Sequence, residues 1–101
     1  MNITLNETEG RLVVLLDGDL DNAASSQAER DIAPVMERDD CDVVFDCSSL
    51  NYNSSSGLRI LLNVYKHTRA TGHNAILRSL PEDIEEVFHI SGFLQLFKIE
   101  K

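Results

Sequence analysis

The spacing of apolar residues predicts strands at both ends of the chain and in its middle. Ile3 to Glu7 alternates weakly up to the turn signal Glu9-Gly10, and Arg11 to Leu16 is a strong apolar run. Together these two segments predict a hairpin or two neighbouring strands. Cys41 to Cys47 is apolar on both faces in its middle, which is typical of a central, buried strand. Two later segments predict a short strand and a final edge strand: Asn74 to Leu77 and Phe93 to Ile99.

Helical spacing of apolar residues begins near Ala23 and predicts the first helix. One face of this helix is apolar, with Ala24, Ala28, Ile32, Val35 and Met36. Pro34 removes one N–H group and crowds the preceding turn, so a kink or a restart is expected near Ile32 to Ala33. Asp17-Gly18-Asp19 is expected to break the strand before this helix, and Asp21 or Asn22 can cap the helix.

Two further helices follow the central strand. The second has an apolar face and runs to about Ala70, where Thr71-Gly72 provides a glycine C-cap; its apolar residues are Leu58, Leu61, Leu62 and Tyr65. The third is expected to begin with Pro81 at its first position, after Ser79 or Leu80, and to end at Gly92. Its predicted apolar face is Ile84, Val87 and Phe88.

The order strand-strand-helix-strand-helix-strand-helix-strand predicts an α/β fold. Helices that alternate with short apolar strands imply a mixed β-sheet with parallel crossovers and with helices packed on it. A chain of 101 residues is expected to form a single domain over residues 1–101.

Composition and charge narrow the range of functions. The formal net charge of −8 argues against nucleic acid or an anionic membrane as a partner and fits a protein with a basic docking surface. The N-terminus lacks the pattern of a secretory signal, which favours a cytoplasmic protein. Cys41 and Cys47 are poorly spaced for a zinc site and are expected to be small, buried, reduced residues. No metal or cofactor is predicted.

The most informative segment is Asn53-Ser54-Ser55-Ser56-Gly57, between the central strand and the second helix. Serine hydroxyls can accept hydrogen bonds from the first-turn N–H groups, and glycine allows close approach of the backbone. A helix N-terminus also favours an anion, so a phosphate on a serine there would be tolerated. From the residues alone, a simple helix cap and a phosphate-bearing site both remain open.

An enzyme is the less favoured interpretation. A serine between strand and helix is reminiscent of a nucleophile elbow, but that motif needs G-x-S-x-G, and only Gly57 is present. His67, His73 and His89 are expected to be surface or packing residues rather than bases. The phosphate-binding G-x-x-x-x-G-K motif is missing from the sequence. A small hydrolase that uses Ser55 or Ser56 stays as a minor alternative, and the chain is predicted not to be an enzyme.

Four motifs, in order, resemble those of the STAS domain of bacterial anti-sigma factor antagonists. Gly18-Asp19-Leu20-Asp21 is similar to the family's G-x-L-D, and Phe45-Asp46-Cys47-Ser48-Ser49-Leu50 to its strand and following loop. Tyr52-Asn53-Ser54-Ser55-Ser56-Gly57-Leu58 is similar to its aromatic-apolar-D-S-S/T-G-L signature, and Ser91-Gly92-Phe93-Leu94 to its S-G-L. The resemblance covers about Ile3 to Ile99. It departs from the family at two positions, with Asn53 in place of an apolar residue and Ser54 in place of the usual acid.

This resemblance implies a non-catalytic switch that regulates transcription. By position, Ser55 is the serine that a cognate anti-sigma factor, itself a serine kinase, phosphorylates. The unphosphorylated form would bind the anti-sigma factor and release the sigma factor, the phosphorylated form would not bind, and a serine phosphatase would reset the switch. A constitutive docking or scaffold module, in which Ser55 is never phosphorylated, is the alternative.

The expected partner-binding surface lies at one edge of the sheet. Loops that follow parallel strands emerge at the same edge, and α/β folds generally place their sites there. The residues expected to contact the partner are Asp19, Asp21, Asn53, Ser54, Ser55, Ser56, Gly57 and Arg59. Asp21 serves equally well as a turn or cap residue. Asp46 is expected to be a further acid near the switch, provided that the fold brings it close.

Overall fold

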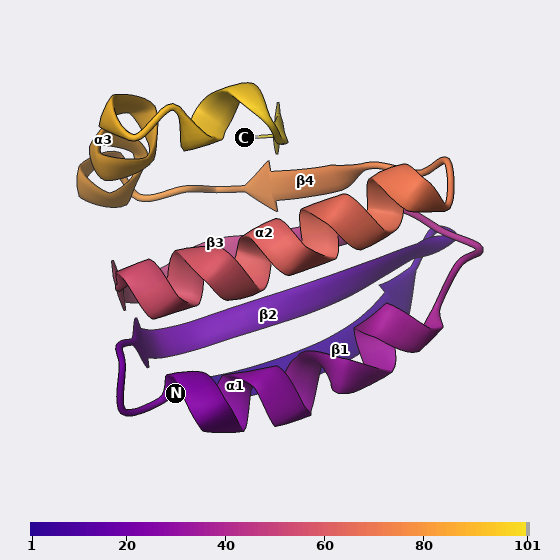
Figure 1. Ribbon diagram of the computed structural model, residues 1–101, viewed down its shortest axis with the longest axis horizontal. Coiled ribbons are helices and arrows are strands. Elements are labelled where there is room, and N and C mark those ends of the chain that lie inside the picture. The colour runs from indigo at the N-terminus through magenta and orange to yellow at the C-terminus, as the bar shows by residue number, and fades with distance from the viewer. Residues whose placement is uncertain (101) are drawn as a thin grey trace.

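A computed structural model describes residues 1–100 of the protein. It shows a five-stranded mixed sheet with three α-helices (Figure 1). The strands lie in the order β1-β2-β3-β4-β5; β1 and β2 are antiparallel, and all later neighbours are parallel. The elements are β1 (Asn2–Thr8), β2 (Arg11–Leu20), α1 (Ser25–Ile32), the 3-10 turn η1 (Ala33–Glu37), β3 (Val43–Asn53), α2 (Ser55–Ala70), β4 (Ala75–Arg78), α3 (Glu82–Ile90), the 3-10 turn η2 (Phe93–Gln95) and β5 (Lys98–Glu100). The predicted α/β fold and mixed sheet are confirmed.

The helices cover one face of the sheet. Each parallel crossover moves one strand further in the same direction, and right-handed crossovers then place every helix on the same side. Figure 1 shows α1 and α2 in front of the strands. The main core lies between these layers and includes the fully buried side chains Leu16, Leu20, Phe45, Leu61, Leu77 and Phe88. Burial of this apolar surface is the main stabilising term of the fold.

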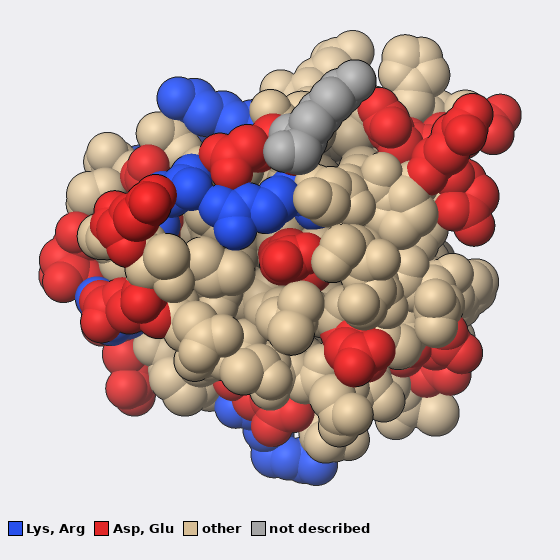
Figure 2. All heavy atoms as spheres, turned by 180° about the vertical axis from the view of Figure 1, so that it is seen from behind, with Lys and Arg blue, Asp and Glu red and all other residues tan. Residues whose placement is uncertain are grey.

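The opposite face of the sheet carries a smaller apolar row. Val13, Val44 and Ile76 are register partners on β2, β3 and β4, and all three are buried. Figure 2 shows this face, where uncharged residues lie between scattered carboxylates and a group of basic side chains. Val44 therefore faces away from Val43 and Phe45, as predicted for a strand that is apolar on both faces.

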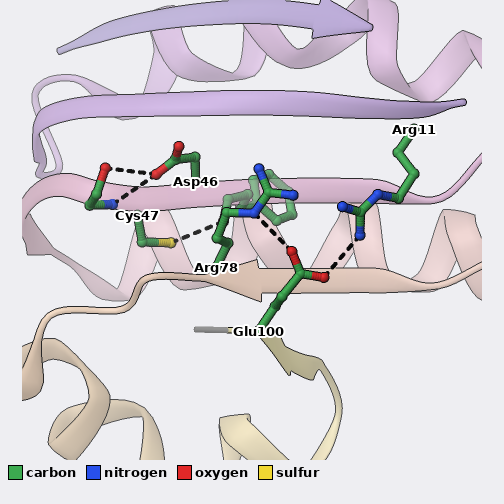
Figure 3. Close-up of polar contacts among 7 residues, drawn as sticks. Arg11, Asp46, Cys47, Arg78 and Glu100 are labelled. Carbon is green, nitrogen blue, oxygen red and sulfur yellow. Dashed lines mark hydrogen bonds and ion pairs between the residues drawn. The ribbon is translucent and has the colours of Figure 1, made fainter. Parts of the chain in front are cut away.

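An ion triad crosses the helix-free face. Glu100 on β5 accepts hydrogen bonds from Arg78 Nε on β4 and from Arg11 Nη1 on β2, each at 2.9 Å (Figure 3). Glu100 thus links the short strand β5 to its neighbour β4 and, through the long side chain of Arg11, to β2 on the far side of β3. The hydrogen bond from Arg11 and then that from Arg78 hold the pKa of the Glu100 carboxyl below its ordinary value.

Several local predictions are confirmed. The first two strands form a hairpin. α1 ends at Ile32, and η1 restarts from Ala33 with Pro34 in its first turn, because proline cannot continue the α-helical hydrogen bonds. Gly72, at a φ of +80°, ends α2: its N–H donates to the Arg69 carbonyl and that of His73 to the Thr68 carbonyl. This pattern is a Schellman motif.

Two predicted strand boundaries are wrong. Asp17-Gly18-Asp19 does not break β2, and the central strand does not end at Cys47 but continues to Asn53. The strands stay paired because β3 carries an extra residue at each of two bulges, so that Asp17 pairs with Ser49 and Leu20 with Asn53. Gly18 adopts a φ of +114°, which a glycine allows at little cost. Pairing between strands overrides local turn signals here.

Three predictions for the C-terminal region need correction. Pro81 is the N-cap of α3 rather than its first helical residue. Phe93 to Ile99 is not a continuous strand: η2 precedes β5, because Phe93 folds back to pack against Phe88 with ring centroids 5.5 Å apart. Val87 does not belong to the buried face of α3 and is 50% exposed, whereas Ile84 and Phe88 are buried.

Glu100→Gln should lower the melting temperature at pH 7, and the difference from the wild type should narrow as the pH falls. A carboxyl with a lowered folded-state pKa contributes stability above its unfolded value near 4.5 and loses it as the pH falls through the folded value. Melting of both proteins from pH 7 to pH 3 tests this, with Glu29→Gln on the exposed surface of α1 as a control. A difference that stays constant across the series would contradict the role of the triad.

Candidate functional site

The ends of β2 and β3 hold the serine turn against the sheet. Leu20 pairs with Asn53 at the last position of both strands, and Ser54 N donates to the Leu20 carbonyl at 2.9 Å. α2 begins at the next residue. The position of the turn is therefore fixed by the same ladder that builds the centre of the sheet.

Ser54 is the helix cap. Its backbone is extended, its Oγ accepts a hydrogen bond from Gly57 N at 3.2 Å, and its carbonyl accepts one from Leu58 N at 2.9 Å. Only 7% of Ser54 is exposed. One of the orphan N–H groups of the first turn is satisfied in this way.

Ser55 has a different environment from its neighbours. It is the first helical residue and is exposed, whereas Ser56 is half-buried. The N–H groups of Ser55 and Ser56 occupy the first two helical positions, where an α-helix offers no backbone acceptor. The positive end of the helix dipole lies at the same place. A negative group on Ser55 would thus be electrostatically favoured.

Gly57 permits the close packing of α2 on the strand ends. A Cβ at this position would lie 2.1 Å from Asn53 Oδ1 and 2.7 Å from Leu20 Cγ. Leu20 is fully buried, and both polar side-chain atoms of Asn53 are buried without a hydrogen-bond partner among the described residues. Glycine is needed here because of space, since its backbone is helical.

The two aspartates expected at this edge have different roles. Asp19 is exposed and is the register partner of Tyr52, two residues before Ser54. Asp21 Oδ1 accepts a hydrogen bond from Ala24 N at 2.8 Å, so this carboxylate closes the turn that leads into α1. Asn22 contributes through its backbone carbonyl, which accepts from Ser25 Oγ.

Arg59 lies on α2 close to Ser55, whereas Asp46 lies far from it. Arg59 is exposed and follows Ser55 by one helical turn, on the same surface of α2. Asp46 is remote: it accepts hydrogen bonds from Ser48 in the middle of β3, roughly 20 Å before Asn53 along the strand. Asp46 therefore does not add to the charge around Ser55.

His67 and His73 lie away from the serine turn. His67 Nε2 is 2.5 Å from the Arg38 carbonyl, and His73 Nδ1 is 3.4 Å from Asp42 Oδ1, both near the far end of α2. That helix is about 24 Å long at about 1.5 Å per residue. His89 is in the last turn of α3. Within residues 1–100, no histidine forms a hydrogen bond with Ser55 or Ser56.

The cysteines, as predicted, are buried. Burial raises the pKa of the Cys47 thiol to about 12, so that thiol is protonated at neutral pH and chemically inert. Across residues 1–100, no group of three or more potential metal ligands comes together. None of the helices described is long and apolar enough to cross a bilayer.

The sequence did not predict which apolar side chains border Ser55 on the side of the turn that faces α3. Tyr52 and Val87 are large apolar residues that are 54% and 50% exposed, and both line a groove beside Ser55. The bulged end of β3 sends Tyr52 outward, and a residue three positions from a buried one on a helix can lie at the margin of the buried face. No local sequence signal distinguishes such residues from core residues.

Comparison with known proteins agrees with this geometry. Residues 2–101 match the family model of the STAS domain, and the chain belongs to that family. It is 35% identical over 99 residues to BtrV of Bordetella bronchiseptica, a protein named as an anti-sigma factor antagonist. The match covers 98% of this chain and 85% of BtrV. It is 24% identical over 100 residues to the anti-sigma F factor antagonist of Paenibacillus polymyxa, covering 98% and 86%. The resemblance predicted from the four motifs is confirmed.

Solved structures show the same fold. The unphosphorylated form of the Bacillus anti-sigma factor antagonist SpoIIAA aligns with a TM-score of 0.80 at 22% identity, covering 99% of this chain and 89% of SpoIIAA. The phosphorylated form of SpoIIAA aligns with a TM-score of 0.73. BtrV, the Paenibacillus protein and SpoIIAA all carry the name of an anti-sigma factor antagonist.

Gly57→Ala should destabilise the protein by about 1–3 kcal/mol, the usual range for overpacking. Alanine favours a helix over glycine by about 1 kcal/mol, but the added Cβ would clash with Asn53 and with the buried Leu20. Urea unfolding measures the difference, with Ser56→Ala in the same turn as a control. Equal or greater stability of Gly57→Ala would show that the strand ends can move away from α2.

Proposed function

We propose that this chain is a cytoplasmic, non-catalytic anti-sigma factor antagonist, a single STAS domain over residues 1–101 that is switched by phosphorylation of Ser55. Its unphosphorylated form binds a kinase-type anti-sigma factor and so releases the sigma factor. The kinase activity of that factor modifies Ser55, and a serine phosphatase restores the binding form.

The main support for this proposal is that the adjacent residues Ser54 and Ser55 have different environments. Ser54 satisfies the helix end from a buried position, which leaves the exposed hydroxyl of Ser55 available for modification. Phosphorylation adds roughly −1.5 to −2 charges at neutral pH. The N-terminus of α2 stabilises that charge, and exposed Arg59 on the same helix surface can pair with it.

The same charge opposes binding. A phosphate buried at a packed interface loses its hydration, which is costly unless the partner supplies a cation. Phosphorylation therefore leaves the fold intact while weakening the complex. The departure of Ser54 from the family's usual acid is compatible with the switch, because serine and aspartate are about equally good N-caps.

Incubation with the kinase-type anti-sigma factors of the same genome, ATP and Mg²⁺ should add one phosphate, on Ser55. Ser55→Ala should abolish it, since Ser54 is buried in the cap. Mass spectrometry locates the phosphate, and titration calorimetry compares the two forms. The modified form should bind at least about tenfold more weakly.

A phosphate on Ser54 or Ser56 would contradict the assignment of the switch residue. A factor that binds tightly but never phosphorylates the chain would instead support the constitutive docking or scaffold alternative. Equal binding of both forms would contradict exclusion by charge.

Asp19→Asn should slow association with the anti-sigma factor and flatten its salt dependence. Asp19 is exposed beside the turn and carries charge that attracts a basic partner surface from a distance. Stopped-flow association rates across a salt series test this. Asp39→Asn, a change of the same charge in the segment after η1, is the control, and equal rates for wild type and Asp19→Asn would refute steering by this carboxylate.

A further inference from the structure

A groove of about 400 Å³ runs between the serine turn and α3. One wall comes from the end of β3 and the first turn of α2, with Tyr52, Ser55 and Leu58. The other comes from α3, with Asp83 and Val87. Ser55 is therefore part of the wall of a cavity large enough for an amino-acid side chain.

The walls of this groove are apolar surface that the fold itself does not use. Tyr52 is 54% exposed and Val87 50%, although Ile84 and Phe88 beside Val87 are buried in the core. Large apolar side chains that gather around a concave surface, rather than lie scattered, mark an interaction site.

Asn53 also contributes to the wall of this groove. Both polar atoms of its side chain are buried and lack a hydrogen-bond partner among residues 1–100. A buried amide without partners destabilises a fold, because its hydrogen bonds to water are lost and not replaced.

Charge around the groove selects the occupant. Asp83 lies in its wall, Glu82 is in the same first turn of α3, and Asp19 lies beside Tyr52 on the neighbouring strand. A second copy of this chain would bring these acids together within a molecule of net charge −8. The surface thus disfavours self-association and suits an apolar side chain that is flanked by Lys or Arg.

We propose that this groove receives an apolar side chain, flanked by basic residues, from the anti-sigma factor. The inference rests on the proposed function and specifies how binding and modification exclude each other. A phosphate on Ser55 would stand in the wall of the groove and place a charge of roughly −2 against the entering apolar group. Phosphorylation then prevents the partner's apolar side chain from entering the groove and also disfavours its contact with the surface around Ser55.

Two matched variants on α3 test the groove. Val87→Gln removes an apolar side chain from the wall, and Ile90→Gln makes the same kind of change at a residue that is 77% exposed and lies outside the groove. Titration calorimetry with the purified anti-sigma factor that phosphorylates Ser55 should show at least about tenfold weaker binding for Val87→Gln. Ile90→Gln should bind within about twofold of wild type, and Val87→Leu, which keeps an apolar wall, should retain binding.

Thermal melting of the same variants separates binding from stability, since both residues are exposed and neither change should lower the melting temperature by more than a few degrees. Wild-type affinity in a folded Val87→Gln would overturn the groove while the phosphorylation switch stands. Equal losses in Val87→Gln and Ile90→Gln would also overturn it, because the contact would then not be specific to the groove. A wild-type chain that binds no kinase-type anti-sigma factor would overturn the proposed function and this inference together.

Discussion

The close contact between Gly57 and the last residues of β2 and β3 determines the position of everything around the serine turn. Leu20 and Asn53 leave no room for a Cβ, so α2 starts directly on the strand ends. The hydrogen bond from Ser54 N to the Leu20 carbonyl holds that start in place. A longer connection would let the turn move relative to the sheet, and Ser55 would then lose its defined position among Asp19, Arg59 and α3.

In the proposed switch, stability and modification depend on adjacent residues of one turn. Ser54 faces inward and supplies the cap, whereas Ser55 faces outward and supplies the modifiable hydroxyl. The helix N-terminus favours negative charge at Ser55, while a packed interface at the same place disfavours it. A modification can therefore control association without threatening the folded state. The buried amide of Asn53, which has no hydrogen-bond partner among the described residues, is the exception, because it weakens the fold beside this turn.

Much of the fold could be predicted because the local signals and the tertiary structure agree. The restart at Pro34 and the end of α2 at Gly72 follow from backbone chemistry that acts within a few residues. The two wrong strand boundaries involve partners that are distant in sequence. Gly18 has the local chemistry of a turn, yet pairing with β3 keeps it in a strand. Val87 fits the helical period of a core residue, yet no element covers it. At the site, the motif identified Ser55, whereas only the three-dimensional arrangement revealed the inward cap at Ser54 and the exposure of Tyr52 beside it.

The strand order has a consequence for how the chain reaches its native state. Every strand of the sheet is flanked only by strands adjacent to it in the sequence, so each parallel addition closes one loop of about 20 to 30 residues. Mixed α/β folds of this kind have intermediate contact order and are expected to fold more slowly than helical bundles and faster than all-β folds. The sheet can grow in the direction of synthesis, from the β1–β2 hairpin outward, without waiting for the C-terminus. The last strand to emerge is also the shortest, and its Glu100 reaches back to Arg11, 89 residues earlier, across the strands already in place.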